Sequence, residues 1–312
     1  MRLLLSLASL LLANAVRAED TKPQAAAERG LKFLLADAAA WKKERQCATC
    51  HHGTFTVWAL VEARKQGYAV APESLTEAVT WTKERFKDLD KPRDTRPGWS
   101  MVNSPALMLG LMATAVDQKE ISADDLKRIA GHLLRHQEED GSWSWASAPA
   151  KNRPPPFFES DEVATRLGIL ALGSAKESKE SAEKAAKWLE KAKPADTTQA
   201  AAYRLLMAAR SKKDFTPELK AILKRQNKDG GWGQVPLAAS DAYATGQALY
   251  LMSLAGVKPD RDEVRRGVAF LVGNQKADGS WPMTRRGHEG VTPGESCART
   301  RSDHREPRTC RD

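Results

Sequence analysis

One short segment combines residue types that could bind a redox group. Cys47 and Cys50 are separated by two residues, and His51 follows directly. This Cys-x-x-Cys-His spacing is the attachment signature of c-type haem, because two such thiols can reach both vinyl groups and the next imidazole can ligate iron. We therefore expect haem c to be attached to Cys47 and Cys50, with His51 as the axial ligand.

Other chemistries for this segment stay open. A Cys-x-x-Cys pair can also form a disulfide or act as a thiol–disulfide redox couple. The same thiols and His51, with or without His52, could instead bind a metal ion. For haem iron the sixth position is undetermined: the candidates are Met101, Met283 and His288. An open five-coordinate site is equally allowed, and it would favour small-ligand binding over pure electron transfer.

Residues 1–18 have the layout of a secretory signal peptide. Arg2 precedes an apolar stretch over residues 3–16, and small residues up to Ala18 allow cleavage before Glu19. The apolar stretch is too short for a comfortable membrane span. We expect a secreted or periplasmic protein without a stable membrane span, in a compartment that suits covalent haem attachment.

Three loops share the pattern Gln-x-x-Asp-Gly-x-Trp, which indicates an internal repeat. They are residues 137–143, 226–232 and 275–281, and a degenerate copy ends at Trp99. Asp-Gly favours a tight turn, since glycine adopts positive φ without steric cost. Glutamine is expected to end a preceding helix, and tryptophan to pack over that helix.

Each loop is expected to join an amphipathic outer helix to an almost wholly apolar inner helix. In the outer helices, a small residue three positions before a bulky one marks one face. These pairs are Gly30/Phe33, Ala78/Trp81, Ala130/Leu133, Ala185/Trp188 and Gly267/Phe270. The inner helices are predicted at residues 54–66, 104–117, 160–174, 198–210 and 240–255. Ser160 and Ser240 are natural N-caps for two of them.

Stacked helical hairpins predict an all-α protein, either an α-solenoid or, if it closes, an α/α toroid. The predicted toroid has roughly six hairpins, the last of them incomplete, within residues 19–284. After Gly294 the sequence has five Arg and no Val, Ile, Leu or aromatic residue, so it cannot form an apolar inner helix. Residues 285–312 are therefore expected to be a disordered or aberrant tail, in which Cys297 and Cys310 could form a disulfide.

The repeated loops resemble the QW motifs of squalene/hopene cyclases and of the related prenyltransferase repeats. The resemblance covers most of residues 25–284 and implies the α/α toroid of those families. The segment from Cys47 to Gly53, followed by Trp58, also resembles bacterial exported proteins that combine a c-type haem motif with squalene-cyclase-like repeats.

The catalytic part of the resemblance does not carry over. Terpenoid cyclases protonate their substrate with an acid of an Asp-x-Asp-Asp motif, but residues 88–91 read Asp-Leu-Asp-Lys. The zinc ligands of prenyltransferases have no counterpart either, because no Cys follows the inner helices. Asp161, Glu162 and Asp241 are the remaining candidate acids, although helix capping accounts for their positions. Whether the chain is an enzyme stays open.

Composition narrows the remaining function classes. A hydrophobic fraction of 41% excludes a multi-spanning membrane protein and a largely disordered one. The net charge of +9 is spread along the sequence and gives no argument for nucleic acid. The leading hypothesis is a haem toroid with a redox or small-ligand role, served by a redox partner. The alternatives are a binding or scaffold toroid with a structural Cys-x-x-Cys, which offers a cavity to a lipid or isoprenoid-like apolar ligand, and a divergent cyclase-like enzyme.

Overall fold

The computed structural model describes residues 3–45, 52–85, 110, 112–113, 116, 120–144, 160–173 and 178–282. Regular structure in these ranges is helical, with two isolated β-bridges at Trp232. The all-α prediction is therefore confirmed for the described residues. The helices are α1 (Leu3–Arg45), α2 (Thr54–Lys65), α3 (Pro72–Arg85), α5 (Ala123–Arg135), α6 (Asp161–Leu172), α7 (Lys179–Lys191), α8 (Thr198–Arg210), α9 (Thr216–Leu223), α10 (Ala242–Leu254) and α11 (Asp262–Asn274).

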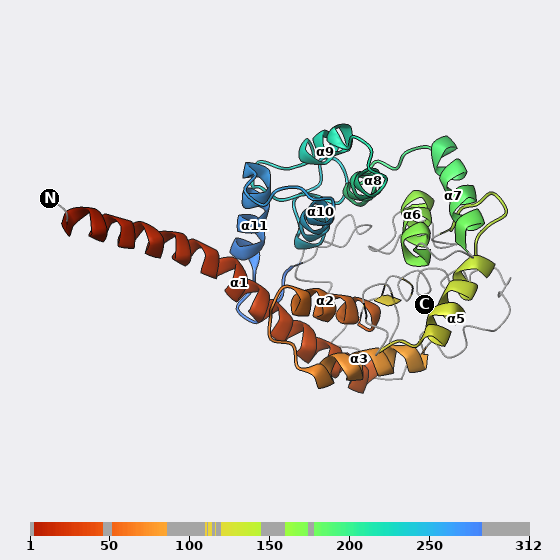
Figure 1. Cartoon of the computed structure of the whole chain (residues 1–312), viewed down its shortest axis with the longest axis horizontal. Helices are drawn as coiled ribbons and strands as arrows, with labels where there is room; N and C mark the ends of the chain where they lie inside the picture. Colours follow the sequence, from red (N-terminus) through yellow and green to blue (C-terminus); the bar gives the residue numbers. More distant parts are fainter. Residues whose placement is uncertain are drawn as a thin grey trace, which may run out of the picture.

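The helices form two layers, which Figure 1 shows as a central and a peripheral set. The inner helices are α2, α6, α8 and α10, and the outer helices are α1, α3, α5, α7, α9 and α11. Inner helix α8 buries residues on every side, whereas the buried residues of outer helix α7 are Ser181 and Ala185. This difference follows from composition, because a helix that is apolar all round must be covered on all sides.

Four predicted inner helices agree with α2, α6, α8 and α10 to within a few residues. The fifth, at residues 104–117, lies mostly outside the described residues. Outer helix α9 lacks the small–bulky pair and was not predicted. Ser160 caps α6 as expected, by accepting a hydrogen bond from the Val163 amide at 3.2 Å.

The prediction that Ser240 caps the inner helix at residues 240–255 is wrong. The N-cap of α10 is Asp241, whose carboxylate accepts a hydrogen bond from the Ala244 amide at 2.7 Å. The Ser240 hydroxyl instead donates to Asp229 in the turn of the preceding loop, at 2.7 Å. The serine is therefore used to hold the loop, and the helix begins one residue later.

Helix α1 is continuous from Leu3 to Arg45, and its N-terminal part projects away from the remaining helices (Figure 1). Residues 3–18, which the sequence predicts to belong to a signal peptide, lie in this projecting part. The side chains of α1 are described from residue 22 to residue 44. Among the described helices, none combines the length and the apolar character that a membrane span requires.

The three Gln–Trp loops, residues 137–143, 226–232 and 275–281, connect neighbouring outer helices through the glutamine side chain. In each loop the glutamine Nε2 donates to the carbonyl of its own loop glycine and to a carbonyl of the next outer helix. The paired acceptors are Gly141 and Ser181 for Gln137, Gly230 and Glu263 for Gln226, and Gly279 and Ala26 for Gln275, all within 2.7–3.0 Å. One side-chain amide thus satisfies two backbone carbonyls and joins two helices.

The loop glycine is required by both conformation and space. Its φ is +95° in Gly141, +86° in Gly230 and +89° in Gly279. A Cβ would also lie 2.3–2.8 Å from a carbonyl oxygen of the next outer helix in all three cases. Any other residue would therefore separate the loop from that helix.

The loop tryptophan packs between helices, and the small residue of the outer helix makes room for it. Each indole Nε1 donates to a carbonyl in the preceding outer helix, at 2.7–2.9 Å. A Cβ at Gly267 would lie 2.7 Å from the Trp232 ring, and one at Gly30 would lie 2.8 Å from the Trp281 ring. The small–bulky pattern of the sequence therefore marks where a neighbouring tryptophan lies.

The last described loop contacts the first helix in the same way as the other loops contact their neighbours. Gln275 of the α11 loop donates to Ala26 in α1, and Arg29 donates to the Gln275 side chain at 2.6 Å. Trp281 lies against Gly30, as Trp232 lies against Gly267. Helices α1 and α11, which are distant in sequence, are therefore neighbours in the outer layer (Figure 1).

We expect Gly30→Val to weaken this closing contact. Its Cβ would meet the Trp281 ring, and overpacking of this kind costs about 1–3 kcal/mol. The matched control is Gly246→Val in α10, where a Cβ would have nothing within 4 Å and helix propensity changes by less than about 0.5 kcal/mol. Urea unfolding of both variants measures the difference. Equal midpoints for the two variants would contradict the contact.

Candidate functional site

The Cys-x-x-Cys-His motif connects the end of α1 to the start of α2. Cys47, Cys50 and His51 lie outside the described residues, as do the sixth-ligand candidates Met101, Met283 and His288, so their predicted roles stay predictions. The residues on either side of the motif are described. They show how the ends of this connection are held.

His52, the residue directly after the motif, is docked on α1. Its ring stacks on Trp41 with centroids 3.9 Å apart and an interplanar angle of 1°. Its Nε2 lies 3.0 Å from the Asp37 carboxylate. Burial lowers the pKa of His52 and outweighs the opposing effect of Asp37, which favours the neutral ring at neutral pH. A neutral His52 donates from Nε2 to Asp37, so this nitrogen is already engaged.

Helix α2 follows the motif in sequence and belongs to the inner layer. Gly53 and Thr54 are buried at its start, and the rings of Phe55 and Trp58 stack with centroids 6.1 Å apart. Trp58 Nε1 donates to the hydroxyl of Tyr250 in α10 at 2.9 Å, and the two rings meet edge to face. The segment after the motif therefore reaches across the inner layer to α10.

The candidate acid Glu162 is the centre of a buried ion cluster. Its carboxylate accepts from Arg204 at 2.9 Å through both oxygens, from Arg166 at 3.1 Å, and from the Ala195 amide at 2.7 Å. The residue is 4% exposed. Burial lowers the pKa of Arg166, although Glu162 opposes this effect. Both carboxylate oxygens of Glu162 are thus used to hold α6 against α8 and the loop before it.

The other two candidate acids also have structural contacts. Asp161 opens α6 and accepts from the Ser144 hydroxyl at 3.3 Å, which links the helix to the preceding Gln–Trp loop. Asp241 is 4% exposed, caps α10 and accepts from Gln234 Nε2 at 2.5 Å. Asp241 thus caps its helix, whereas Asp161 lies in the first turn of α6, which Ser160 caps. Residues 88–91 lie outside the described ranges.

Replacing Glu162 with Gln should destabilise the fold. The substitution leaves Arg166 and Arg204 without their counter-charge, and breaking a buried pair costs about 3 kcal/mol. Asp161→Asn, in the same helical turn, is the matched control, and we expect at most about 1 kcal/mol because its position is less buried. The two free energies of unfolding are compared by denaturant titration. A Glu162→Gln variant as stable as the control would show that the cluster is not structural.

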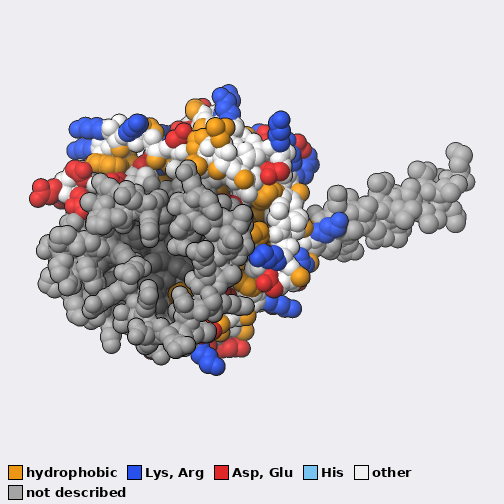
Figure 2. Space-filling view, turned by 180° about the vertical axis from the view of Figure 1, so that it is seen from behind, with side chains coloured by type: hydrophobic (Ala, Val, Ile, Leu, Met, Phe, Trp, Pro, Cys, Tyr) orange, Lys and Arg blue, Asp and Glu red, His pale blue; other side chains and the backbone are white. Residues whose placement is uncertain are grey.

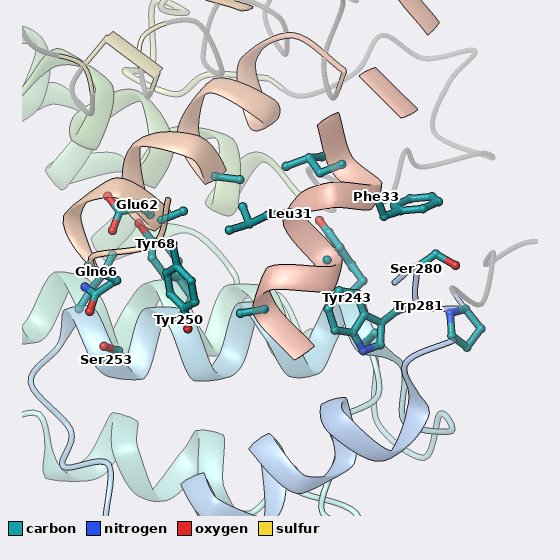
Figure 3. Close-up of a pocket in the computed structure, with 18 residues that line it drawn as sticks. Leu31, Phe33, Glu62, Gln66, Tyr68, Tyr243, Tyr250, Ser253, Ser280 and Trp281 are labelled. Atoms are coloured by element: carbon teal, nitrogen blue, oxygen red, sulfur yellow. The ribbon is translucent and has the colours of Figure 1, made fainter. Parts of the chain in front are cut away.

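A cavity of about 850 Å³ is lined by residues of α1, α2 and α10. We call it the α2–α10 cavity; Trp281 lies at one end of it (Figure 3). Figure 3 shows Glu62, Gln66 and Ser253 at the other end, away from Trp281. Burial, followed by the nearby Glu62 carboxylate, raises the pKa of Tyr250 in its wall to about 12. The wall is thus apolar and neutral over most of its length.

A second cavity, of about 740 Å³, lies among the inner helices α2, α6, α8 and α10. Tyr250 and Leu254 line both cavities. Tyr203 lines the second one, and burial raises the pKa of its hydroxyl. The sequence identified the apolar inner helices but not these spaces, because a cavity depends on how far apart helices are placed.

Within the described ranges, no group of three or more His, Cys, Asp or Glu side chains is placed to hold a metal ion. Figure 2 shows Lys and Arg side chains interspersed with Asp and Glu along the described edge of one face. No known protein-family model matches the chain, and no curated protein matches it.

Proposed function

We propose that this protein is an exported α/α toroid of the squalene-cyclase and prenyltransferase repeat type that binds c-type haem. Cys47 and Cys50 would attach the haem, and His51 would be its axial ligand. The role is redox or small-ligand binding, served by a redox partner.

The two helical layers and the closing contact support a toroid. Each Gln–Trp loop joins one outer helix to the next, and the loop of α11 joins α1 through Gln275. This contact is described at three junctions, α5–α7, α9–α11 and α11–α1, and the return to the first helix at the last of them supports a closed ring over an open solenoid.

The residues present fit the group. Two thiols and an imidazole at the attachment spacing match the donor set of haem c. When bound, haem supplies an iron centre that can exchange an electron or take up a small ligand. The chain's own residues position the segment: α1 ends just before the motif, and α2 begins just after it.

The docking of His52 is the observation that carries the haem proposal. The stack on Trp41 and the contact with Asp37 hold the residue that follows His51 against α1. Because His52 Nε2 is engaged with Asp37, this nitrogen is not available to iron, which favours His51 as the axial ligand. The same contact argues against a metal site that uses Nε2 of His52.

A second candidate function is haem-free binding of an apolar ligand, with Cys47 and Cys50 as a structural pair. The cavity among the inner helices favours it, since about 740 Å³ is within the size range of small-molecule sites. Catalysis of the cyclase kind has less support, because Asp161, Glu162 and Asp241 hold structural contacts.

Expression with the signal peptide, in a periplasm that contains c-type maturation machinery, tests the proposal. We expect a Soret band that persists after acid–acetone extraction, because thioether bonds hold the haem covalently. Cys47→Ser/Cys50→Ser should remove this band and retain the helical circular dichroism spectrum.

Cys297→Ser/Cys310→Ser is the matched control and should retain the full Soret band. A colourless wild-type protein under these conditions, or haem that extracts completely, would reject the haem proposal and favour apolar-ligand binding.

A further inference from the structure

The cavity of about 740 Å³ among the inner helices has one end where those helices end, and we call it the inner cavity. Its lining includes the last residues of α2, α8 and α10, which are Lys65, Arg210 and Leu254, and also Gly173, the C-cap of α6. Tyr203 also lines the cavity, and it precedes Arg210 by roughly 10 Å along α8. The inner cavity therefore extends from the helix ends to rings inside the inner layer.

The Tyr203 hydroxyl is a buried donor without a hydrogen-bond partner in the described part of the chain. The residue is 6% exposed, and its side chain lines the inner cavity. Burial, followed by the nearby Tyr250, raises the pKa of this hydroxyl, and no hydrogen bond within the described ranges opposes the effect. A buried hydroxyl without a partner destabilises a fold. Phenylalanine would therefore suit this wall better than tyrosine, unless the oxygen meets a ligand.

Tyr250 presents a second phenolic hydrogen to the same cavity. Its oxygen accepts a hydrogen bond from Trp58 Nε1 at 2.9 Å, which leaves its own O–H to donate. Burial, followed by Glu62, raises the pKa of Tyr250 to about 12, so this phenol is protonated at neutral pH. Because Tyr250 also acts on the pKa of Tyr203, the two hydroxyls lie near one another. Two uncharged donors therefore line the inner cavity, and both require an acceptor.

The charges at the helix ends favour an uncharged ligand. A helix C-terminus carries partial negative charge, and the described inner helices α2, α6, α8 and α10 all end at this cavity. Lys65 and Arg210 offset that charge, and Glu62 pairs with Lys65 at 3.1 Å. An anion would meet the helix ends and Glu62, whereas a cation would meet Lys65 and Arg210. Neither sign of charge is therefore complementary to the lining.

We propose that the inner cavity binds one uncharged apolar molecule that carries a carbonyl oxygen, such as a ketone or a quinone. The Tyr203 and Tyr250 hydroxyls donate to that oxygen, and the side chains of Ile169, Leu206 and Leu251 contact the hydrocarbon part. This inference rests on the second candidate function, to which it gives a ligand class, and it does not depend on haem.

A matched pair of probes tests the ligand class on the full chain. The ketone 1-tetralone and the hydrocarbon tetralin share one carbon skeleton, and only the ketone has a carbonyl oxygen. We expect the ketone to bind with a stoichiometry of one, and about threefold to tenfold more tightly than tetralin, because it gains a hydrogen bond. Isothermal titration calorimetry measures both affinities. The anion 1-naphthoate, a probe of similar size, should bind more weakly than the ketone.

Tyr203→Phe tests the location, because it removes the hydroxyl and keeps the ring. It should lower the affinity for 1-tetralone about threefold to tenfold and leave the affinity for tetralin unchanged. Without ligand, the variant should unfold at the same temperature as the wild type or higher, since it loses a buried hydroxyl that has no partner. The matched control is Tyr243→Phe in α10, whose hydroxyl accepts from Gln247 at 2.8 Å outside the inner cavity. It should bind 1-tetralone as the wild type does.

Several results would overturn the proposal. If the ketone and the hydrocarbon bind equally, or if Tyr203→Phe binds 1-tetralone as the wild type does, the carbonyl inference fails while apolar-ligand binding stands. Tighter binding of 1-naphthoate would replace the uncharged ligand with an anionic one. Binding of none of the three probes would reject both the inference and the second candidate function. The Soret measurement is independent of each of these results.

Discussion

The outer layer depends on one side-chain amide in each Gln–Trp loop. Glutamine Nε2 carries two hydrogens, and the structure directs them to carbonyls of two successive elements, as in Gln226 with Gly230 and Glu263. Losing either bond would leave a carbonyl without its partner at a helix contact, which costs about 1–3 kcal/mol. This contact brings the loop backbone so close to the next outer helix that the loop position facing it must be glycine. The loop tryptophan then packs beside the same contact.

Much of the fold could be predicted from the sequence, because the repeat is written in residue types that have few alternatives. Asp-Gly turns and apolar helices located α6, α8 and α10 to within a few residues. Helix α9 was missed because it lacks the small–bulky pair that marks other outer helices. The contact of Gln275 with Ala26 could not be predicted either. Local patterns show which face of a helix is used, but not which distant helix covers it.

The haem chemistry of the candidate site stays a prediction from the sequence, because Cys47, Cys50 and His51 lie outside the described residues, whereas the setting of the motif needed the structure. The spacing of Cys47, Cys50 and His51 points to haem without any structure, whereas the docking of His52 on Trp41 and Asp37 depends on α1 folding back beside α2. The N-cap of α10 was predicted wrongly. The place of Asp241 beside Ser240 suggested that the serine caps α10, but the loop turn competes for the serine hydroxyl and the aspartate takes the cap.

Helix α1 holds both His52, from the segment next to it in sequence, and Gln275, from near the other end of the described chain. The second contact spans 249 residues. Contacts of such sequence separation raise contact order and form late in folding. During folding, the local contact of α1 with His52 is therefore available before its contact with Gln275. The entropic cost of bringing α1 and the α11 loop together grows only logarithmically with the length of chain between them. This contact therefore loses little stability, although it forms slowly.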